Sequence, residues 1–116
     1  AQRVADVAEA MQSDAGLALA GLRVDGGPAR NRFLMQALAD NLGSEVQVAA
    51  QVESTASGVA HMARHHAYGV PLGAIAASWR AAEVYTPRIT GDERETRRAR
   101  WRRAVALMLE LYAPEP

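Results

Sequence analysis

The segment at residues 22–31, which reads LRVDGGPARN, constrains the fold of this chain more than any other part of the sequence. Residues 22–24 are typical of the end of a buried strand, and the apolar positions after the segment recur at helical spacing, at Phe33, Leu34, Ala37, Leu38 and Leu42. Gly26 and Gly27 permit a positive φ and carry no Cβ that would keep a ligand from the backbone. Pro28 suits a first helical position, where the missing N–H costs nothing. A strand, a glycine turn and a free helix N-terminus together favour a nucleotide or phosphate site, although two glycines also close many ordinary strand-to-helix turns.

The remaining sequence alternates helical and strand patterns and therefore indicates an α/β fold. We expect helices at 1–13, 28–42, 54–68, 72–79 and about 90–112, and strands at 21–25 and 45–48. Gly16 is expected as a left-handed C-cap, and Ser54 or Thr55 as an N-cap. Pro87 rules out a continuous helix over 83–90, because proline disfavours the α conformation at the residue before it.

The two predicted strands are too few to form a stable sheet by themselves, so the sheet edges and helix faces need further partners. The chain begins with Ala1, which is not a methionine and already belongs to a helical pattern. We therefore expect a piece of something longer, at most one domain in extent. Exposed sheet edges also make a homo-oligomer an open alternative.

The composition excludes several classes of function. The chain has 13 basic and 13 acidic residues, so no net charge attracts nucleic acid or an anionic membrane. Every basic residue is an arginine, which excludes a P-loop lysine and Schiff-base chemistry. There is no cysteine, and no apolar run approaches the ~20 residues of a membrane span. We expect neither a nucleic-acid partner nor a membrane partner.

The last predicted helix carries most of its charge as arginine, at Arg94, Arg97, Arg98, Arg100, Arg102 and Arg103. Acidic residues are interleaved, and arginine commonly covers the solvated side of a helix, so we expect a solvated face there. The helix also carries an apolar stripe that we expect to be partly buried, formed by Trp101, Val105, Leu109 and Tyr112. We expect Trp79 and Trp101 to serve core or interdomain packing.

His61 and His65 have the i, i+4 spacing that can place two metal ligands on one helix face. A metal site needs a third ligand, and His66 points elsewhere on the helix. We therefore expect a solvated histidine-bearing face and no metal site. The nearby serines form no acid–histidine–serine arrangement, so a hydrolase is not expected.

Five segments spread over nearly the whole chain form a recognisable set. They are residues 4–11, 22–27 with 31–36, 39–40 with 46–48, 53–60, and 85–87 with 101–105. The most specific pair is Asp-Gly-Gly at 25–27 with Asn31, followed by Ser-Thr-Ala-x-Gly at 54–58. In this set the chain resembles the C-terminal part of the FGGY carbohydrate kinases.

The resemblance implies an α/β fold: a partial actin/hexokinase-like (ribonuclease H-like) ATPase domain with few strands and several helices. These kinases move the γ-phosphate of ATP to a sugar or polyol hydroxyl, and residues 1–116 would form the C-terminal segment of their second, nucleotide-side domain. By resemblance, Gly26 and Gly27 would lie against the adenosine of ATP, and Asn31 would hydrogen-bond the nucleotide. We expect Asp25 to brace the turn, with a ligand contact as the alternative.

The resemblance also implies what this chain lacks. The family's catalytic aspartate, its phosphate-binding hairpin, its Mg²⁺ ligands and most of its sugar contacts belong upstream, so we expect no catalytic residue here and no turnover by the chain alone. The partners would be ATP or ADP with Mg²⁺, a sugar or polyol whose identity stays open, and the missing N-terminal domain, in the cytoplasm. The alternative is a catalytically dead remnant that acts as a binding or oligomerisation module.

Three positions depart from the pattern of the family. Ser57 stands where leucine is usual, Val59 where a small residue is usual, and His61 where an aromatic residue is common. We expect these changes to alter the packing around a pocket wall while leaving Gly26, Gly27 and Asn31 untouched. The resemblance further implies that Gly58 lets its helix pack closely against the neighbouring strand.

Overall fold

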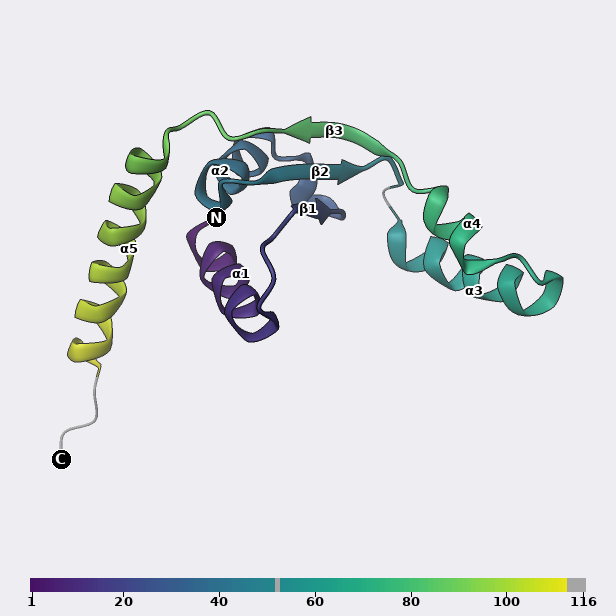
Figure 1. The fold of residues 1–116 in the computed structure, drawn as a ribbon, viewed down its shortest axis with the longest axis horizontal. Coiled ribbons are helices and arrows are strands. Elements are labelled where there is room, and N and C mark those ends of the chain that lie inside the picture. The colour runs from purple at the N-terminus through teal and green to yellow at the C-terminus, as the bar shows by residue number, and fades with distance from the viewer. Residues whose placement is uncertain (52, 113–116) are drawn as a thin grey trace.

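The computed structural model describes residues 1–51 and 53–112, and within them it confirms a mixed α/β fold (Figure 1). The elements follow one another as α1 (Gln2–Ala15), β1 (Gly21–Val24), the 3₁₀-helix η1 (Gly27–Arg30), α2 (Arg32–Leu42), β2 (Glu45–Ala49), α3 (Ser54–Tyr68), α4 (Leu72–Ala77), β3 (Ala81–Tyr85) and α5 (Gly91–Leu111). The five predicted helical segments and both predicted strands are present.

The sheet has the order β1-β2-β3, with β1 and β2 parallel and β3 antiparallel to β2. Val46 is the central residue of the register, paired with Leu22 on one side and Tyr85 on the other. The sequence analysis missed β3 and was wrong to count only two strands. The segment Ala81–Tyr85 lacks a strict polar–apolar alternation, and it becomes a strand because β2 offers it a free edge.

The apolar core lies between α2 and one face of the sheet. Val46 is fully buried there, together with Met35, Leu38 and Ala39 of α2. Side chains alternate across a strand, so Leu22 and Val48 face the same core while Arg23 and Gln47 belong to the opposite face. On the α2 side, α1 adds its two buried alanines, Ala5 and Ala8.

The ends of the helices follow the predicted turn chemistry at the glycines. Gly16 ends α1 with φ at +65°, and Gly43 ends α2 with φ at +69°, both in the left-handed conformation. The prediction of Ser54 or Thr55 as an N-cap is wrong. Glu53 occupies the cap position, and the hydroxyl of Ser54, the first residue of α3, donates instead to the carbonyl oxygen of Gln51 at 3.3 Å.

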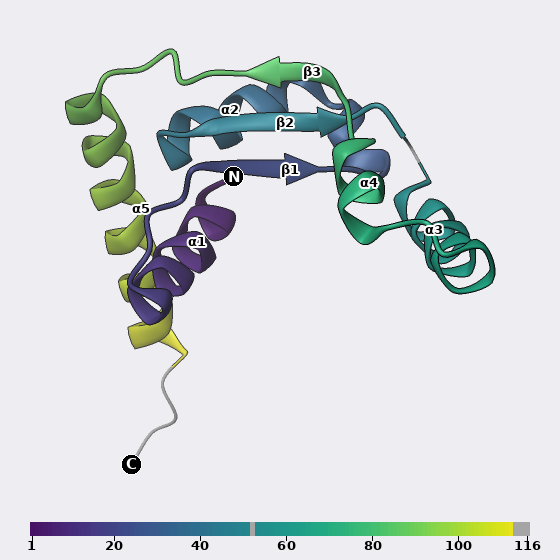
Figure 2. The ribbon, with the colours of Figure 1, turned by 45° about the vertical axis from the view of Figure 1, so that its right-hand side comes forward.

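The chain is extended for its length. Its radius of gyration is 18.2 Å, whereas a compact domain of this size has about 13 Å. Figures 1 and 2 show the reason, because α3 and α4 lie beyond one end of the sheet and α5 lies beyond the other. The apolar stripe of α5 is partly buried, as predicted: Trp101 and Val105 are half-buried, whereas Leu109 and Tyr112 are exposed.

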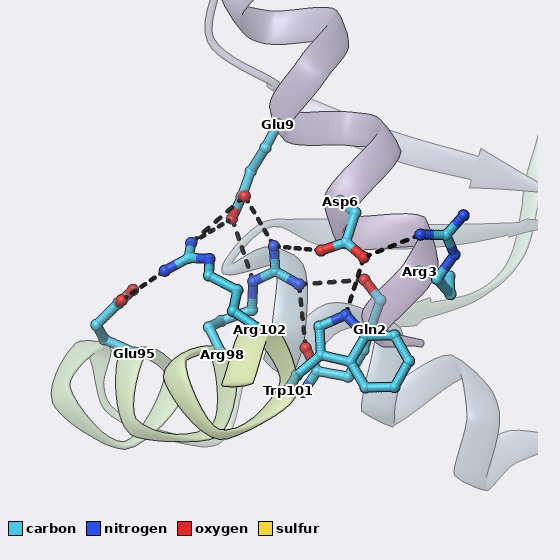
Figure 3. A network of polar contacts seen from close by, with 8 residues as sticks. All are labelled: Gln2, Arg3, Asp6, Glu9, Glu95, Arg98, Trp101 and Arg102. Carbon is cyan, nitrogen blue, oxygen red and sulfur yellow. Dashed lines mark hydrogen bonds and ion pairs between the residues drawn. The ribbon is translucent and has the colours of Figure 1, made fainter. Parts of the chain in front are cut away.

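A polar network joins α5 to α1 (Figure 3). The guanidinium of Arg98, only 2% exposed, lies with Nη2 2.9 Å from Asp6 Oδ1 and 2.7 Å from Glu9 Oε2. Its Nη1 donates to the backbone oxygen of Gln2 at 3.1 Å. The indole N–H of Trp101 donates to the other oxygen of Asp6 at 2.9 Å. The expectation of a solvated arginine face is thus wrong for Arg98, whereas the packing role expected for Trp101 agrees with this contact.

The same contacts shift two pKa values. The hydrogen bond from Trp101 is the main cause that lowers the pKa of Asp6 below its ordinary 3.8; burial opposes this shift, and the charge and hydrogen bond of Arg98 reinforce it. Burial by itself would lower the pKa of Arg98, but Glu9 and Asp6 outweigh it and raise that pKa further. Both shifts favour the charged pair.

Replacing Arg98 by methionine should lower the free energy of unfolding by about 3 kcal/mol, because it leaves two carboxylates facing an apolar group. Urea unfolding followed by tryptophan fluorescence measures this loss. The matched control is Arg100→Met on the exposed side of the same helix, with an expected change within about 0.5 kcal/mol. Equal effects of both substitutions would contradict a structural role of the network.

The pH dependence of stability provides a separate test of Asp6. Its lowered folded-state pKa means that the carboxylate stabilises the fold above pH 3.8, and that this contribution is lost as pH falls through the folded-state value. Asp6→Asn should therefore be less stable than wild type at pH 7, with a gap that narrows as the pH is lowered toward 3. Denaturant titrations at a series of pH values measure the gap, and a constant gap would refute the assignment.

Candidate functional site

The turn that follows β1 has no side chain at two successive positions, Gly26 and Gly27. Gly26 has φ at +80° and ψ at −177°, a region that essentially only glycine occupies, whereas Gly27 does not need a positive φ. A Cβ built on either glycine would meet no atom within 4 Å. The backbone here is open to a ligand from the side where side chains would otherwise stand.

The helix predicted for 28–42 is interrupted, and the interruption places Asn31. Residues Gly27–Arg30 form the 3₁₀-helix η1, and α2 begins only at Arg32. Pro28 is indeed in the first turn, but of η1 rather than of α2. Asn31 lies between the two helices in an extended conformation, so the chain changes direction at the residue predicted to contact the nucleotide.

Asn31 is the N-cap of α2. Its Oδ1 accepts a hydrogen bond from the backbone N–H of Leu34 at 3.1 Å, which fixes the side-chain orientation. The residue is exposed, and no described residue accepts from its Nδ2. The amide nitrogen is therefore a positioned donor that a ligand can use.

Asp25 has a less defined position. Its side chain is exposed, and within residues 1–51 and 53–112 no hydrogen bond reaches its carboxylate. The expected bracing role consequently finds no hydrogen-bonded partner in the described part of the chain.

The turn lies at the carboxyl end of β1, next to the carboxyl end of its parallel neighbour β2 (Figure 2). Ligands of open α/β sheets bind outside the carboxyl ends of the parallel strands. The backbone of Gly26 and Gly27 and the amide of Asn31 follow one such end. The sequence-predicted residues are thus brought to the edge where this fold class places its ligands.

A cavity of about 520 Å³ lies at the carboxyl end of β2 and is bordered by residues of α3 and α4. Its lining includes Gln51, Ser54, Ser57, His61, Ile75, Trp79 and Arg80. Two of the three departures from the family pattern, Ser57 and His61, are in this lining, whereas Val59 is exposed. The cavity was not predicted, because its walls come from three separate stretches of the chain, at 49–51, 54–61 and 75–80.

The helix α3 does not pack as expected. None of its described residues is buried, and a Cβ on Gly58 would meet nothing within 4 Å, so the close packing predicted for Gly58 is wrong for this chain. Along the same helix, the ring Nδ1 of His65 donates to the backbone oxygen of Val70 at 2.7 Å.

The described residues contain no cluster of three side chains suited to a metal ion. No described helix has the length and apolar character to cross a membrane.

The comparisons with known proteins give the class of this chain. Residues 1–67 match the C-terminal domain of the FGGY family of carbohydrate kinases, and the chain belongs to this family. Several glycerol kinases are among the family members that its sequence resembles. The glycerol kinase of Petrotoga mobilis is 41% identical over 111 residues, which cover 90% of this chain and 21% of that protein. The glycerol kinase of Acinetobacter baylyi is 46% identical over 105 residues, covering 89% and 21%.

A solved structure supports the fold. The crystal structure of Plasmodium falciparum glycerol kinase with ADP superposes with a TM-score of 0.82 at 23% identity, covering 99% of this chain and 22% of that one. The predicted partial actin/hexokinase-like fold is thereby confirmed. The chain spans about a fifth of the length of the glycerol kinases it matches.

The two glycines of the turn should differ in their response to alanine. Gly26→Ala forces a Cβ onto φ of +80° and should lower the free energy of unfolding by about 2 kcal/mol. Gly27→Ala, which needs no such conformation and meets no neighbour, should stay within about 0.5 kcal/mol of wild type. Chemical unfolding of both variants measures the difference; similar losses would contradict the turn geometry.

Proposed function

We propose that this chain is the C-terminal segment of the nucleotide-side domain of an ATP-dependent carbohydrate or polyol kinase, similar to glycerol kinase. In this proposal, Gly26 and Gly27 lie against the adenosine of ATP, and Asn31 donates a hydrogen bond to it. The main observation in support is the turn at the carboxyl end of β1, where Gly26 and Gly27 leave the backbone uncovered. It is followed by the exposed side-chain amide of Asn31, whose orientation a hydrogen bond fixes. Membership in the kinase family supports the proposal, as does the glycerol kinase of Plasmodium falciparum, whose structure was solved with ADP.

The chemistry of the turn suits the adenosine end of the nucleotide rather than its phosphates. An uncharged backbone surface and an amide complement a ribose or a base, and Gly26, Gly27 and Asn31 supply no cation for a phosphate. The described residues include no cluster of three carboxylates or histidines that could hold Mg²⁺. Phosphoryl transfer requires a positioned γ-phosphate, its metal and an oriented hydroxyl. We propose that other parts of the enzyme supply these, that the 116-residue chain is inactive alone, and that the enzyme acts in the cytoplasm, where ATP is available.

ATP titration of the chain by isothermal calorimetry tests the site. Asn31→Ser keeps an N-cap oxygen for α2 but removes the amide donor, so it should bind ATP about tenfold more weakly at nearly unchanged stability. Gly27→Asp adds a side chain and a negative charge at the proposed contact and should abolish binding. Gly58→Ala is the control, because its new Cβ meets nothing, and it should bind as wild type does.

The outcomes distinguish a nucleotide-binding kinase segment from a catalytically dead remnant that acts as an interaction module. Equal ATP affinity of wild type, Asn31→Ser and Gly27→Asp would refute the site, and a wild-type chain that does not bind ATP would favour an interaction module. Release of ADP by the chain with ATP, Mg²⁺ and glycerol would refute the claim that it is inactive alone.

A further inference from the structure

An apolar groove runs along the C-terminal half of α5, beside α1. Its volume is about 390 Å³, and Arg3 of α1 is the one charged residue among the described residues that line it. The rest of the lining comes from α5 and ends at Tyr112. Met108 is 54% exposed, and Leu109 and Tyr112 are 69% and 75% exposed. Soluble proteins rarely leave a contiguous apolar surface uncovered, so the groove points to an interaction partner.

The lining has the spacing of a coiled-coil seam. Its central residues follow one another at intervals of four, three and four positions: Trp101, Val105, Met108 and Tyr112. This is the pattern into which a second helix inserts its own apolar side chains. An amphipathic helix binds such a groove through side chains that recur at i, i+3 or i+4, and i+7. The spacing of the lining therefore selects a helix with an apolar face.

The seam continues a contact that α5 already makes within the chain. Three positions before Trp101, Arg98 lies on the same face of the helix and is buried against α1. Trp101 itself donates to Asp6 of α1. Beyond Val105, which is half-buried, this face of the helix is exposed. Its first half is thus covered by α1, and its second half is open.

The remainder of the kinase is the occupant that the shape of the chain favours. Glycerol kinases similar to this chain extend well beyond it, since the matched region covers 21% of their length. Nearly the whole chain, with the outlying α5, superposes on one part of a glycerol kinase. A radius of gyration of 18.2 Å is large for a self-contained domain, but it suits a segment that packs against further chain. A second copy of the chain is the competing occupant.

We propose that the groove between α1 and α5 is a docking surface for a helix from the remainder of the kinase. The docked helix presents apolar side chains to Met108, Leu109 and Tyr112, and a carboxylate to Arg3. Arg3 is suited to this pairing because it is exposed and its Nη1 lies 3.7 Å from Asp6 Oδ2, too far for a hydrogen bond. This docking rests on the proposed function, since it takes the chain to be one segment of a kinase.

A full-length chimera tests the docking. It joins the part of the Acinetobacter baylyi glycerol kinase that precedes the matched region to this chain, which is 46% identical over that region. Leu109→Glu puts a charge into the groove, so it should lower the melting temperature of the chimera by about 5 °C or more. Leu109→Ala should lower it less, in the same direction. Leu107→Glu is the matched control, because Leu107 is 56% exposed and outside the groove lining, and it should stay within about 2 °C of the parent chimera.

The same substitutions in the 116-residue chain distinguish docking from the folding of the chain itself. Leu109 is exposed there, so Leu109→Glu and Leu107→Glu should both melt within about 2 °C of wild type. A loss by Leu109→Glu in the isolated chain as large as in the chimera would overturn the proposal. Equal melting temperatures of the two chimera variants would overturn it as well.

Two further measurements on the chimera separate the competing occupant and the nucleotide contact. Sedimentation velocity should give the same oligomeric state for every variant, and dissociation by Leu109→Glu alone would assign the groove to a second copy and overturn the proposal. Calorimetry with ATP reports on the nucleotide contact by itself. A chimera that binds ATP but melts alike with Leu109→Glu and Leu107→Glu would refute the docking alone. A chimera that does not bind ATP but shows the difference would refute the nucleotide contact and support the docking.

Discussion

The packing of α2 on one face of the sheet is the contact on which the rest of this structure depends. Val46 is fully buried at its centre, and burial of an apolar side chain of this size stabilises a protein by about 1.5–3 kcal/mol. Because α2 connects β1 to β2, the same contact holds these two strands parallel and in register. It therefore fixes where β1 ends, and the Gly26–Gly27 turn must open at the carboxyl edge of the sheet.

A second contact, which is electrostatic, holds α5 against α1. The helices α1 and α5 are far apart in sequence and are joined largely by charge, with Arg98 between Asp6 and Glu9. Arg98 is buried, whereas the side chains of Asp6 and Glu9 are 28% and 51% exposed. Ion pairs with a buried partner contribute little net stability over an apolar substitute, but removing one partner is destabilising, and the contacts fix one geometry. In the extended chain, α5 lies beyond one end of the sheet, and α3 and α4 lie beyond the other (Figures 1 and 2). Polar side chains hold α5 to α1, whereas residues of α3 and α4 border a cavity.

Much of the local structure was predictable because it obeys local rules. Gly16 takes the left-handed conformation that its place after α1 predicts, and the apolar spacing of α2 gives its buried face. The strand β3 was not predictable, because an edge strand owes its conformation to the neighbour it pairs with. Arg98 was not predictable either, since an arginine among five others on one helix has nothing local to distinguish it until α1 lies opposite.

The sequence by itself determined the glycine turn, the helix ends at Gly16 and Gly43 and the likeness to FGGY kinases, because each depends on residues close together in the chain or on their order. Tertiary structure alone decided that Asn31 is an N-cap between two helices. Its Oδ1 accepts a hydrogen bond from Leu34, while no described residue accepts one from its Nδ2. It also decided that Ser57, His61, Trp79 and Arg80 share one cavity. These facts depend on distances between separate segments, which the packing of α2 on the sheet and the positions of α3 and α4 beyond its end set, and which no local pattern encodes.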